Sequence, residues 1–167
     1  MTKSKADYSF FNTHAVEMME KLMKDFGVSV ETAAAVFGNA GHESNGFRSL
    51  QEKKPLVKGS RGGYGIMQWT GPRRRAYEAY CDRNHLDPQA MGTNYAYLWV
   101  ELNGPEGQNG KLLQKMDLAT GLYAKTEIFM RTFLRPGIPH LDSRVVWAHR
   151  AATAYLEKHR GDQLVHL

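Results

Sequence analysis

A run of small residues at positions 32–41 is the feature that most constrains how this chain can fold. The run consists of alanine, glycine, threonine and asparagine, interrupted only by Val36 and Phe37. A helix with such short side chains lets other elements approach closely on every side, so we expect it to lie inside the core. The helix leads to Glu43, whose carboxyl group should therefore emerge from dry surroundings.

The position of Glu43 suggests acid chemistry. A carboxyl group that is partly removed from water is harder to ionise, so its pKa rises toward the range in which it donates a proton at neutral pH. A glycosidic oxygen needs such a donor when its bond is cleaved. A second interpretation stays open at this point, in which Glu43 is a solvated glutamate at a helix end beside the capping residue Ser44.

A glycine-rich segment follows at positions 62–71. Gly62, Gly63 and Gly65 permit positive φ angles and close approach of the backbone. The apolar residues at positions 64, 66, 67 and 69 form a short strand-like pattern that Gln68 interrupts. The segment therefore predicts a short β-hairpin that forms one wall of a cleft next to the end of the helix.

Two motifs carry a family resemblance. Segments 43–47 (ESNGF) and 65–69 (GIMQW) resemble the ES…GLMQ pattern of goose-type lysozymes and lytic transglycosylases. The longer segment 63–74 (GYGIMQWTGPRR) resembles the phage tail lysozyme family, within the lysozyme-like superfamily, more closely still. Segments 101–102, 133–137 and 143–144 also look like that family, so the resemblance covers most of the chain.

The resemblance implies a mainly α (α+β) fold, a lysozyme-like two-lobed helical domain with one small β-hairpin beside the active-site cleft. It implies a muramidase that hydrolyses the β-1,4 bond between N-acetylmuramic acid and N-acetylglucosamine in peptidoglycan and so lyses bacteria. Glu43 carries over as the general acid. The expected substrate-binding residues are Ser44, Tyr64, Gln68, Trp69, Thr70 and Arg74.

Some of these residues have a structural alternative. Tyr64 and Trp69 have flat apolar faces with a polar tip, which suit a sugar ring, but they would also suit the core of a hairpin. In the basic run 73–75, we expect an arginine to face an anion, because positive side chains at a helix start oppose the macrodipole. The alternative is that one of them pairs with Glu78 at helical spacing.

A second carboxylate is harder to assign. Glycosidases generally use two acids, and Glu52, nine positions after Glu43, is the catalytic candidate. Glu52 could instead form a surface ion pair with one of the neighbouring lysines. The goose-type pattern would place an aspartate before the second motif, yet no aspartate occurs between Asp25 and Asp82. A lytic transglycosylase, with Glu43 as its sole catalytic group and the muramyl 6-hydroxyl as nucleophile, therefore stays open.

The formal charge of +5 favours a polyanionic partner. We expect a peptidoglycan strand and, as a second partner, an anionic outer-membrane surface. The sequence contains no helix-turn-helix, RNP-like strand or long basic stripe, so we expect no nucleic acid. We also expect a monomer, and a non-catalytic glycan-binding module remains a less favoured alternative.

Cys81 is the only cysteine, so no internal disulfide can form and the chain can fold in a cytoplasm. Residues 1–7 have no apolar core, so we expect no signal peptide. A free endolysin should therefore stay in the host cytoplasm until release and then act in the periplasm on the cell wall, whereas a virion component, the alternative, would reach the wall from outside. His42 lacks a second histidine four residues later, so we expect no metal, and no cofactor is expected either.

The chain is expected to form one catalytic domain over residues 1–167, with no separate wall-binding module. Apolar periodicity and capping residues predict helices at 12–26, from 29 to 43, 73–84, from 87 to 102, 118–133 and 142–159. Thr70 and Pro72 are expected to begin the third of these helices. Segment 104–110 is expected to be an exposed connection, and segment 135–139 to separate the last two helices.

Overall fold

The structure is a computed structural model that describes residues 6–165, with side chains described as far as residue 160. The expectation about a signal peptide concerns residues 1–7, of which 1–5 lie outside the described residues. Within residues 6–165, no helix is long and apolar enough to cross a bilayer.

The described part of the chain is mainly helical, as the sequence predicts. Its α-helices are α1 (Ser9–Phe26), α2 (Val30–Glu43), α3 (Pro72–Asn84), α4 (Met91–Asn103), α5 (Lys111–Leu118), α6 (Leu122–Phe129) and α7 (Leu141–Val165). A 3-10 helix, η1 (Pro105–Gly110), precedes α5, and a π-helical turn, η2 (Met130–Leu134), continues α6.

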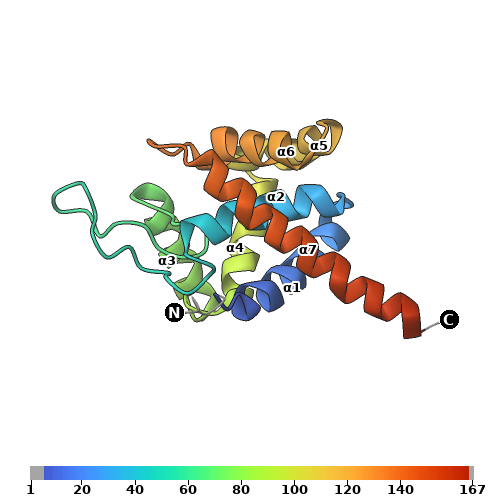
Figure 1. Cartoon of the computed structure of the whole chain (residues 1–167). Coiled ribbons are helices and arrows are strands. Elements are labelled where there is room, and N and C mark those ends of the chain that lie inside the picture. Colours follow the sequence, from blue (N-terminus) through green and yellow to red (C-terminus); the bar gives the residue numbers. More distant parts are fainter. Residues whose placement is uncertain (1–5, 166–167) are drawn as a thin grey trace, which may run out of the picture.

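Helix α2 is the centre of the fold, which confirms the prediction made from its small residues. Ser29 caps it by accepting a hydrogen bond from the Thr32 amide (3.1 Å), and all residues at positions 32–41 are buried. Figure 1 shows α7 crossing α2, with α5 and α6 on one side and α1 on the other. A Cβ built on Gly38 would lie 2.4 Å from the Ala148 Cα, so only glycine allows α7 to cross this closely.

The predicted β-hairpin is wrong for the described residues. Segment 62–71 contains no named strand, and only two isolated antiparallel bridges occur there, Gln51 to Tyr64 and Tyr64 to Trp69. Tyr64 and Trp69 exchange both backbone hydrogen bonds at 2.9 Å, and residues 65–68 form a tight turn between them. Gly65 and Gln68 have positive φ angles, and the consecutive residues Ile66 and Met67 are both buried, so the chain turns before an alternating strand can form.

Other element boundaries differ for identifiable reasons. Helix α3 begins at Pro72 as predicted, but its N-cap is Gly71, since the Thr70 hydroxyl donates instead to the Gln68 carbonyl (3.0 Å). Helix α4 begins at Met91, because Asp87 and the following proline form a turn in which the Asp87 carboxylate accepts from the Gln89 amide. Segment 104–110 consists of the 3-10 helix η1 and its N-cap Gly104, and it is not fully exposed.

The predicted helix at 118–133 begins later, at Leu122, and runs through α6 into η2. Helix α5 was not predicted from the sequence, and residues 119–121 separate it from α6. The buried Lys125 Nζ donates to the carbonyls of Met116 and Ala119, both at 2.7 Å, and to that of Asp117. This ammonium group satisfies the carbonyls at the end of α5, which lets the chain stop and restart there.

Candidate active site

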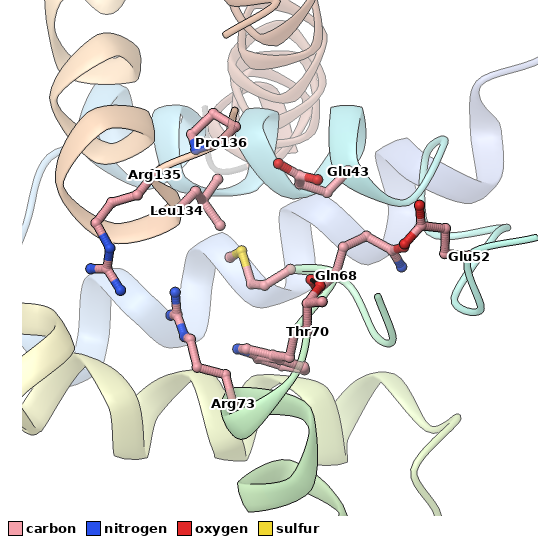
Figure 2. Close-up of a pocket in the computed structure, with 10 residues that line it drawn as sticks. Glu43, Glu52, Gln68, Thr70, Arg73, Leu134, Arg135 and Pro136 are labelled. Carbon is pink, nitrogen blue, oxygen red and sulfur yellow. Dashed lines mark hydrogen bonds between the residues drawn. The ribbon is translucent and has the colours of Figure 1, made fainter. Parts of the chain in front are cut away.

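A cleft of about 570 Å³ lies between the end of α2, the turn that joins Tyr64 to Trp69, the start of α3 and the chain at the end of η2. Figure 2 shows Glu43, Glu52 and Gln68 toward one end of this cleft, and Arg73 and Arg135 toward the other. The lining residues are Glu43, Glu52, Met67, Gln68, Trp69, Thr70, Arg73, Leu134, Arg135 and Pro136. Both carboxylates named from the sequence are therefore in one cavity.

Glu43 is held by an arginine from α7. The Arg144 Nη1 donates to Glu43 Oε1 at 2.7 Å, and the Arg144 side chain is only 2% exposed. The same guanidinium donates to the Pro139 carbonyl (2.7 Å) and to Asn39 Oδ1 (3.3 Å). Among the described residues, Arg144 donates to Oε1 of the Glu43 carboxyl, so this oxygen has a fixed partner. No described side chain or backbone group is hydrogen-bonded to Oε2, and Glu43 lines the cleft.

Burial dominates the electrostatics of Glu43. The loss of water around its carboxyl raises its pKa above the usual range, and the Arg144 guanidinium opposes this effect without reversing it. The negative charge of Glu52 acts in the same direction as burial. The net result is a carboxyl group that keeps its proton at a higher pH than a free glutamate does, as the sequence predicts.

His42 lies on the same end of α2 and is held neutral. Its Nδ1 is 2.8 Å from the Ser143 hydroxyl, and its ring centroid is 5.4 Å from that of His140. Burial, followed by the charges of Arg144 and His140, lowers the pKa of His42 to about 4. His42 therefore joins α2 to the start of α7 without adding a positive charge beside Glu43 at neutral pH.

Glu52 reaches the cleft from the long loop between α2 and α3. Its Oε2 accepts a hydrogen bond from the Gly63 amide at 2.7 Å, and its backbone amide donates to the Gly63 carbonyl at 2.9 Å. A Cβ on Gly62 would lie 2.7 Å from the same carboxylate oxygen. The two glycines therefore let the backbone close around the Glu52 side chain.

Gln68 and Trp69 line the cleft, but much of their bonding capacity is used to hold the turn. Gln68 Nε2 donates to the carbonyls of Leu50 (2.8 Å) and Gly65 (2.9 Å). The Trp69 side chain is only 2% exposed, and its ring lies 4.6 Å from that of Tyr77. Thr70 is exposed and lines the cleft.

A buried carboxylate connects the turn to the helices. Glu101 of α4 accepts from Trp69 Nε1 and makes two hydrogen bonds with Arg73, both at 2.9 Å. Arg73 Nη1 also donates to the Phe133 carbonyl at 2.7 Å, which ties α3 to η2. Beside it, Arg135 is 52% exposed in its side chain and pairs with Glu106 at 2.9 Å. The far end of the cleft therefore contains the guanidinium groups of Arg73 and Arg135, which Glu101 and Glu106 hold in place.

Three of the residues expected to bind substrate lie outside this lining. Ser44 is fully buried, where its hydroxyl donates to the Ala40 carbonyl (2.7 Å) and accepts from the Phe47 amide (3.0 Å). Tyr64 lines a different hollow, next to Phe10 and Leu50 in the structure.

Arg74 is the third. It is buried, and its guanidinium donates to the carbonyls of Arg61 (2.7 Å) and Gly62 (3.2 Å) and to the Gln51 side chain (2.9 Å). Its Nε also lies 3.8 Å from Glu78, the partner that helical spacing suggested. Arg74 thus holds the long loop against α3, and its neighbour Arg73 is the arginine of this run that lines the cleft.

The sequence interpretation did not assign a site role to Arg144, Arg73, Arg135 or Glu101. All four residues fall in segments that carry the family resemblance, but the resemblance assigned a role to none of them. Arg144 is 101 positions from Glu43, and no local pattern relates the two. Within residues 6–165, no group of three or more histidine, cysteine, aspartate or glutamate residues is arranged to hold a metal ion.

Comparison with known proteins identifies a family for most of the chain. The sequence model of a family described as phage tail lysozyme matches residues 13–155, which is most of the chain. No curated protein matches the chain.

Proposed function

The chain belongs to the phage tail lysozyme family, and from that premise we propose that it is a muramidase in which Glu43 is the general acid. Membership of this family makes it a lysozyme-like enzyme that degrades peptidoglycan. The observation that carries the finer proposal is the environment of Glu43, a carboxyl group whose pKa is raised by burial at the wall of a cleft.

In the proposed reaction, Glu43 protonates the oxygen that leaves when the glycosidic bond breaks. Arg144 holds Oε1, so Oε2 is the oxygen that we assign to proton transfer. Once the proton has left, the Arg144 guanidinium stabilises the resulting carboxylate. Arg144 is a positioning residue in this scheme, because its own contacts are with the protein.

We assign the second carboxylate to Glu52, which shares the cleft with Glu43. In this assignment it activates water or stabilises the positive charge that develops on the sugar ring. Gln68, Trp69 and Thr70 remain the proposed contacts for the glycan because they line the cleft, while Ser44, Tyr64 and Arg74 are left out. We add Arg73 and Arg135, whose guanidinium groups suit the carboxylates that peptidoglycan carries.

One observation favours the second candidate, a lytic transglycosylase. Glu52 Oε2 is already bonded to the Gly63 amide, as expected for a carboxylate that mainly holds the loop. A transglycosylase needs only Glu43, because the muramyl 6-hydroxyl closes the ring itself. Mass spectrometry of digested peptidoglycan separates the two, since hydrolysis leaves reducing ends and transglycosylation leaves anhydromuramyl ends.

The experiment that tests the proposal compares wild type with Glu43→Gln on purified peptidoglycan. The amide keeps the size and one hydrogen-bond acceptor but cannot donate a catalytic proton, so release of soluble fragments should fall roughly 10²–10⁴-fold. Glu31→Gln, at the exposed opposite end of α2, is the matched control and should leave the rate unchanged. If Glu43→Gln is folded and retains nearly full activity, Glu43 is not the acid.

A further inference from the structure

The loop between Glu52 and Gly63 presents an uncovered apolar tip. Leu56 is 95% exposed and Val57 is 71% exposed, and Leu56 is the most exposed large apolar side chain of the described residues. Figure 1 shows the segment between α2 and α3 projecting away from the helices. These two adjacent aliphatic side chains expose apolar surface to water. Folded proteins usually bury such surface or use it to bind a partner.

The loop projects from an ordered base. The Glu52 amide donates to the Gly63 carbonyl at 2.9 Å, which closes the two ends of the loop. Gln51 Nε2 and Arg74 Nη1 both donate to the Arg61 carbonyl, at 2.8 Å and 2.7 Å. The tip itself contains a turn, in which the Ser60 amide donates to the Val57 carbonyl. Because both ends are held, the tip is presented at a defined place beside the cleft.

The tip is also strongly basic. Residues 53–60 (KKPLVKGS) contain Lys53, Lys54 and Lys58 and no acidic residue, and all three lysines are exposed. Among the described residues, none of these three lysines forms an ion pair. Aliphatic side chains surrounded by free ammonium groups match an anionic lipid surface, where the chains enter the acyl boundary and the cations meet phosphates.

A glycan is a poorer match for this tip. Proteins contact sugar rings with flat aromatic faces and with hydrogen-bond donors and acceptors. Leu56 and Val57 offer neither, whereas their branched chains suit the interior edge of a bilayer.

We propose that loop 53–60 docks the protein on an anionic phospholipid bilayer, with Leu56 and Val57 inserted among the lipids and the three lysines at the headgroups. The cleft is then held next to the membrane surface, because Glu52 lies both at the base of the loop and in the cleft lining. This docking goes beyond the proposed catalysis and does not depend on Glu43.

The test is sedimentation of the full chain with vesicles of two compositions, equimolar phosphatidylglycerol and phosphatidylcholine, and phosphatidylcholine alone. Wild type should bind the anionic vesicles and not the neutral ones, and binding should weaken as salt rises. The Leu56→Ser/Val57→Ser double variant should bind at least about tenfold more weakly. Replacing Lys53, Lys54 and Lys58 by glutamine should cost about fivefold for each lysine.

Matched controls lie on other surfaces. Leu118→Ser removes an aliphatic side chain that is 86% exposed on α5, and should leave vesicle binding unchanged. A triple change of Lys24, Lys111 and Lys115 to glutamine removes the same charge from exposed helical positions and should have a much smaller effect than the loop change. Glu43→Gln should bind vesicles as wild type does, which separates a failure of this inference from a failure of the catalytic proposal.

Three results would overturn the inference. One is that wild type does not bind anionic vesicles, and another is that both loop variants bind them as tightly as wild type. The third is that the loop variants bind vesicles normally but lose affinity for purified peptidoglycan, which would make the loop a contact for the wall polymer. Unchanged turnover of soluble glycan fragments by Leu56→Ser/Val57→Ser would support docking on lipid.

Discussion

The two walls of the cleft are built in different ways. Glu43 stands on α2, a helix of small buried residues whose position is set by close packing against α7. Glu52 stands on a loop whose position is set by hydrogen bonds and buried charges, among them Gln68, Arg74 and the Glu101 network. One wall depends on shape, and the other depends on polar contacts.

This difference suggests how the site divides its tasks. A helix packed on all sides can keep water from Glu43 and so raise its pKa, but it cannot adjust easily. A loop held by hydrogen bonds at its base can carry a second carboxylate and an exposed tip within a short stretch of sequence. Substitutions in the two walls should therefore destabilise the protein for different reasons. A substitution in the α2 wall should disturb helix packing, and one in the loop wall should leave buried polar groups without hydrogen-bond partners.

The largest effect on stability is expected from Glu101→Gln. Glu101 is 7% exposed and neutralises Arg73 while it accepts from Trp69, so the amide leaves a mostly buried guanidinium with only the more distant Glu106, at 4.0 Å, as a counter-charge. We expect a loss of about 3–5 kcal/mol in the free energy of unfolding, measured by urea denaturation. Glu106→Gln, which removes the more exposed pair with Arg135 (2.9 Å) and the long contact with Arg73 (4.0 Å), should cost less than about 1 kcal/mol. Equal effects of the two variants would show that the polar wall does not depend on Glu101.

The next largest effect is on catalysis. Glu52→Gln keeps an oxygen that can accept from the Gly63 amide, so the loop should stay in place while the negative charge is lost. If Glu52 is the second carboxylate, turnover of peptidoglycan should fall about 100-fold or more without a change in melting temperature. Glu31→Gln again serves as the control. Nearly normal turnover, together with anhydromuramyl ends in the products, would favour the transglycosylase.

The packing of the helical wall is tested by Gly38→Ala. The added methyl group would lie 2.4 Å from the Ala148 backbone, so α2 and α7 would have to separate. We expect a loss of about 2 kcal/mol in the free energy of unfolding. Gly92→Ala, in α4 with no atom within 4 Å of the new Cβ, should instead stabilise the protein by about 0.5–1 kcal/mol. A neutral Gly38→Ala would mean that the crossing of α2 and α7 is looser than described.

The smallest expected effect is a pH dependence from His42. Its pKa falls from 6.5 to about 4 on folding, so its contribution to stability is complete above pH 6.5 and is lost as the pH falls toward 4. Partial exposure limits this contribution to about 1–2 kcal/mol. The stability difference between wild type and His42→Gln should therefore shrink by that amount between pH 7 and pH 4. His149→Gln, on the exposed side of α7, should show no such change.

Glu43 acts in the opposite direction. Its pKa is raised on folding, so its contribution to stability is complete below its ordinary pKa of 4.5 and is lost as the pH rises through the raised value. The comparison of wild type with His42→Gln cancels this effect, because both proteins contain Glu43.

Several parts of the fold were predictable because their cause is local. The small residues at 32–41 indicated a helix buried on all sides, and capping residues indicated where the first helix ends and the second begins, which the structure places at Gly27 and Ser29. The glycines of segment 62–71 indicated a tight turn, and they do adopt positive φ at Gly62 and Gly65. The strand pattern within that turn was misleading, since two consecutive apolar residues are buried by the helices around them.

The expected substrate contacts show what local reasoning leaves open. Trp69 and Arg74 were expected to bind substrate, with a hairpin core and a pair with Glu78 as the alternatives, and both are buried with partners outside their own segment, Glu101 and the Arg61 carbonyl. Arg73 and Arg74 are adjacent and chemically identical, yet only Arg73 lines the cleft. Their difference follows from the rotation of α3 against α4 and the loop, which composition does not encode.

By itself, the sequence determined that a helix of small residues leads to Glu43 and lies inside the core, because side-chain volume and capping act within a few residues. Only the tertiary structure decided that Arg144 meets Glu43, that Glu52 shares its cleft, and that Glu101 holds the opposite end. Such pairings depend on the angle and separation at which helices pack, and here glycines of α2 allow the close approach of α7, with Gly38 against Ala148 and Gly41 against Trp147.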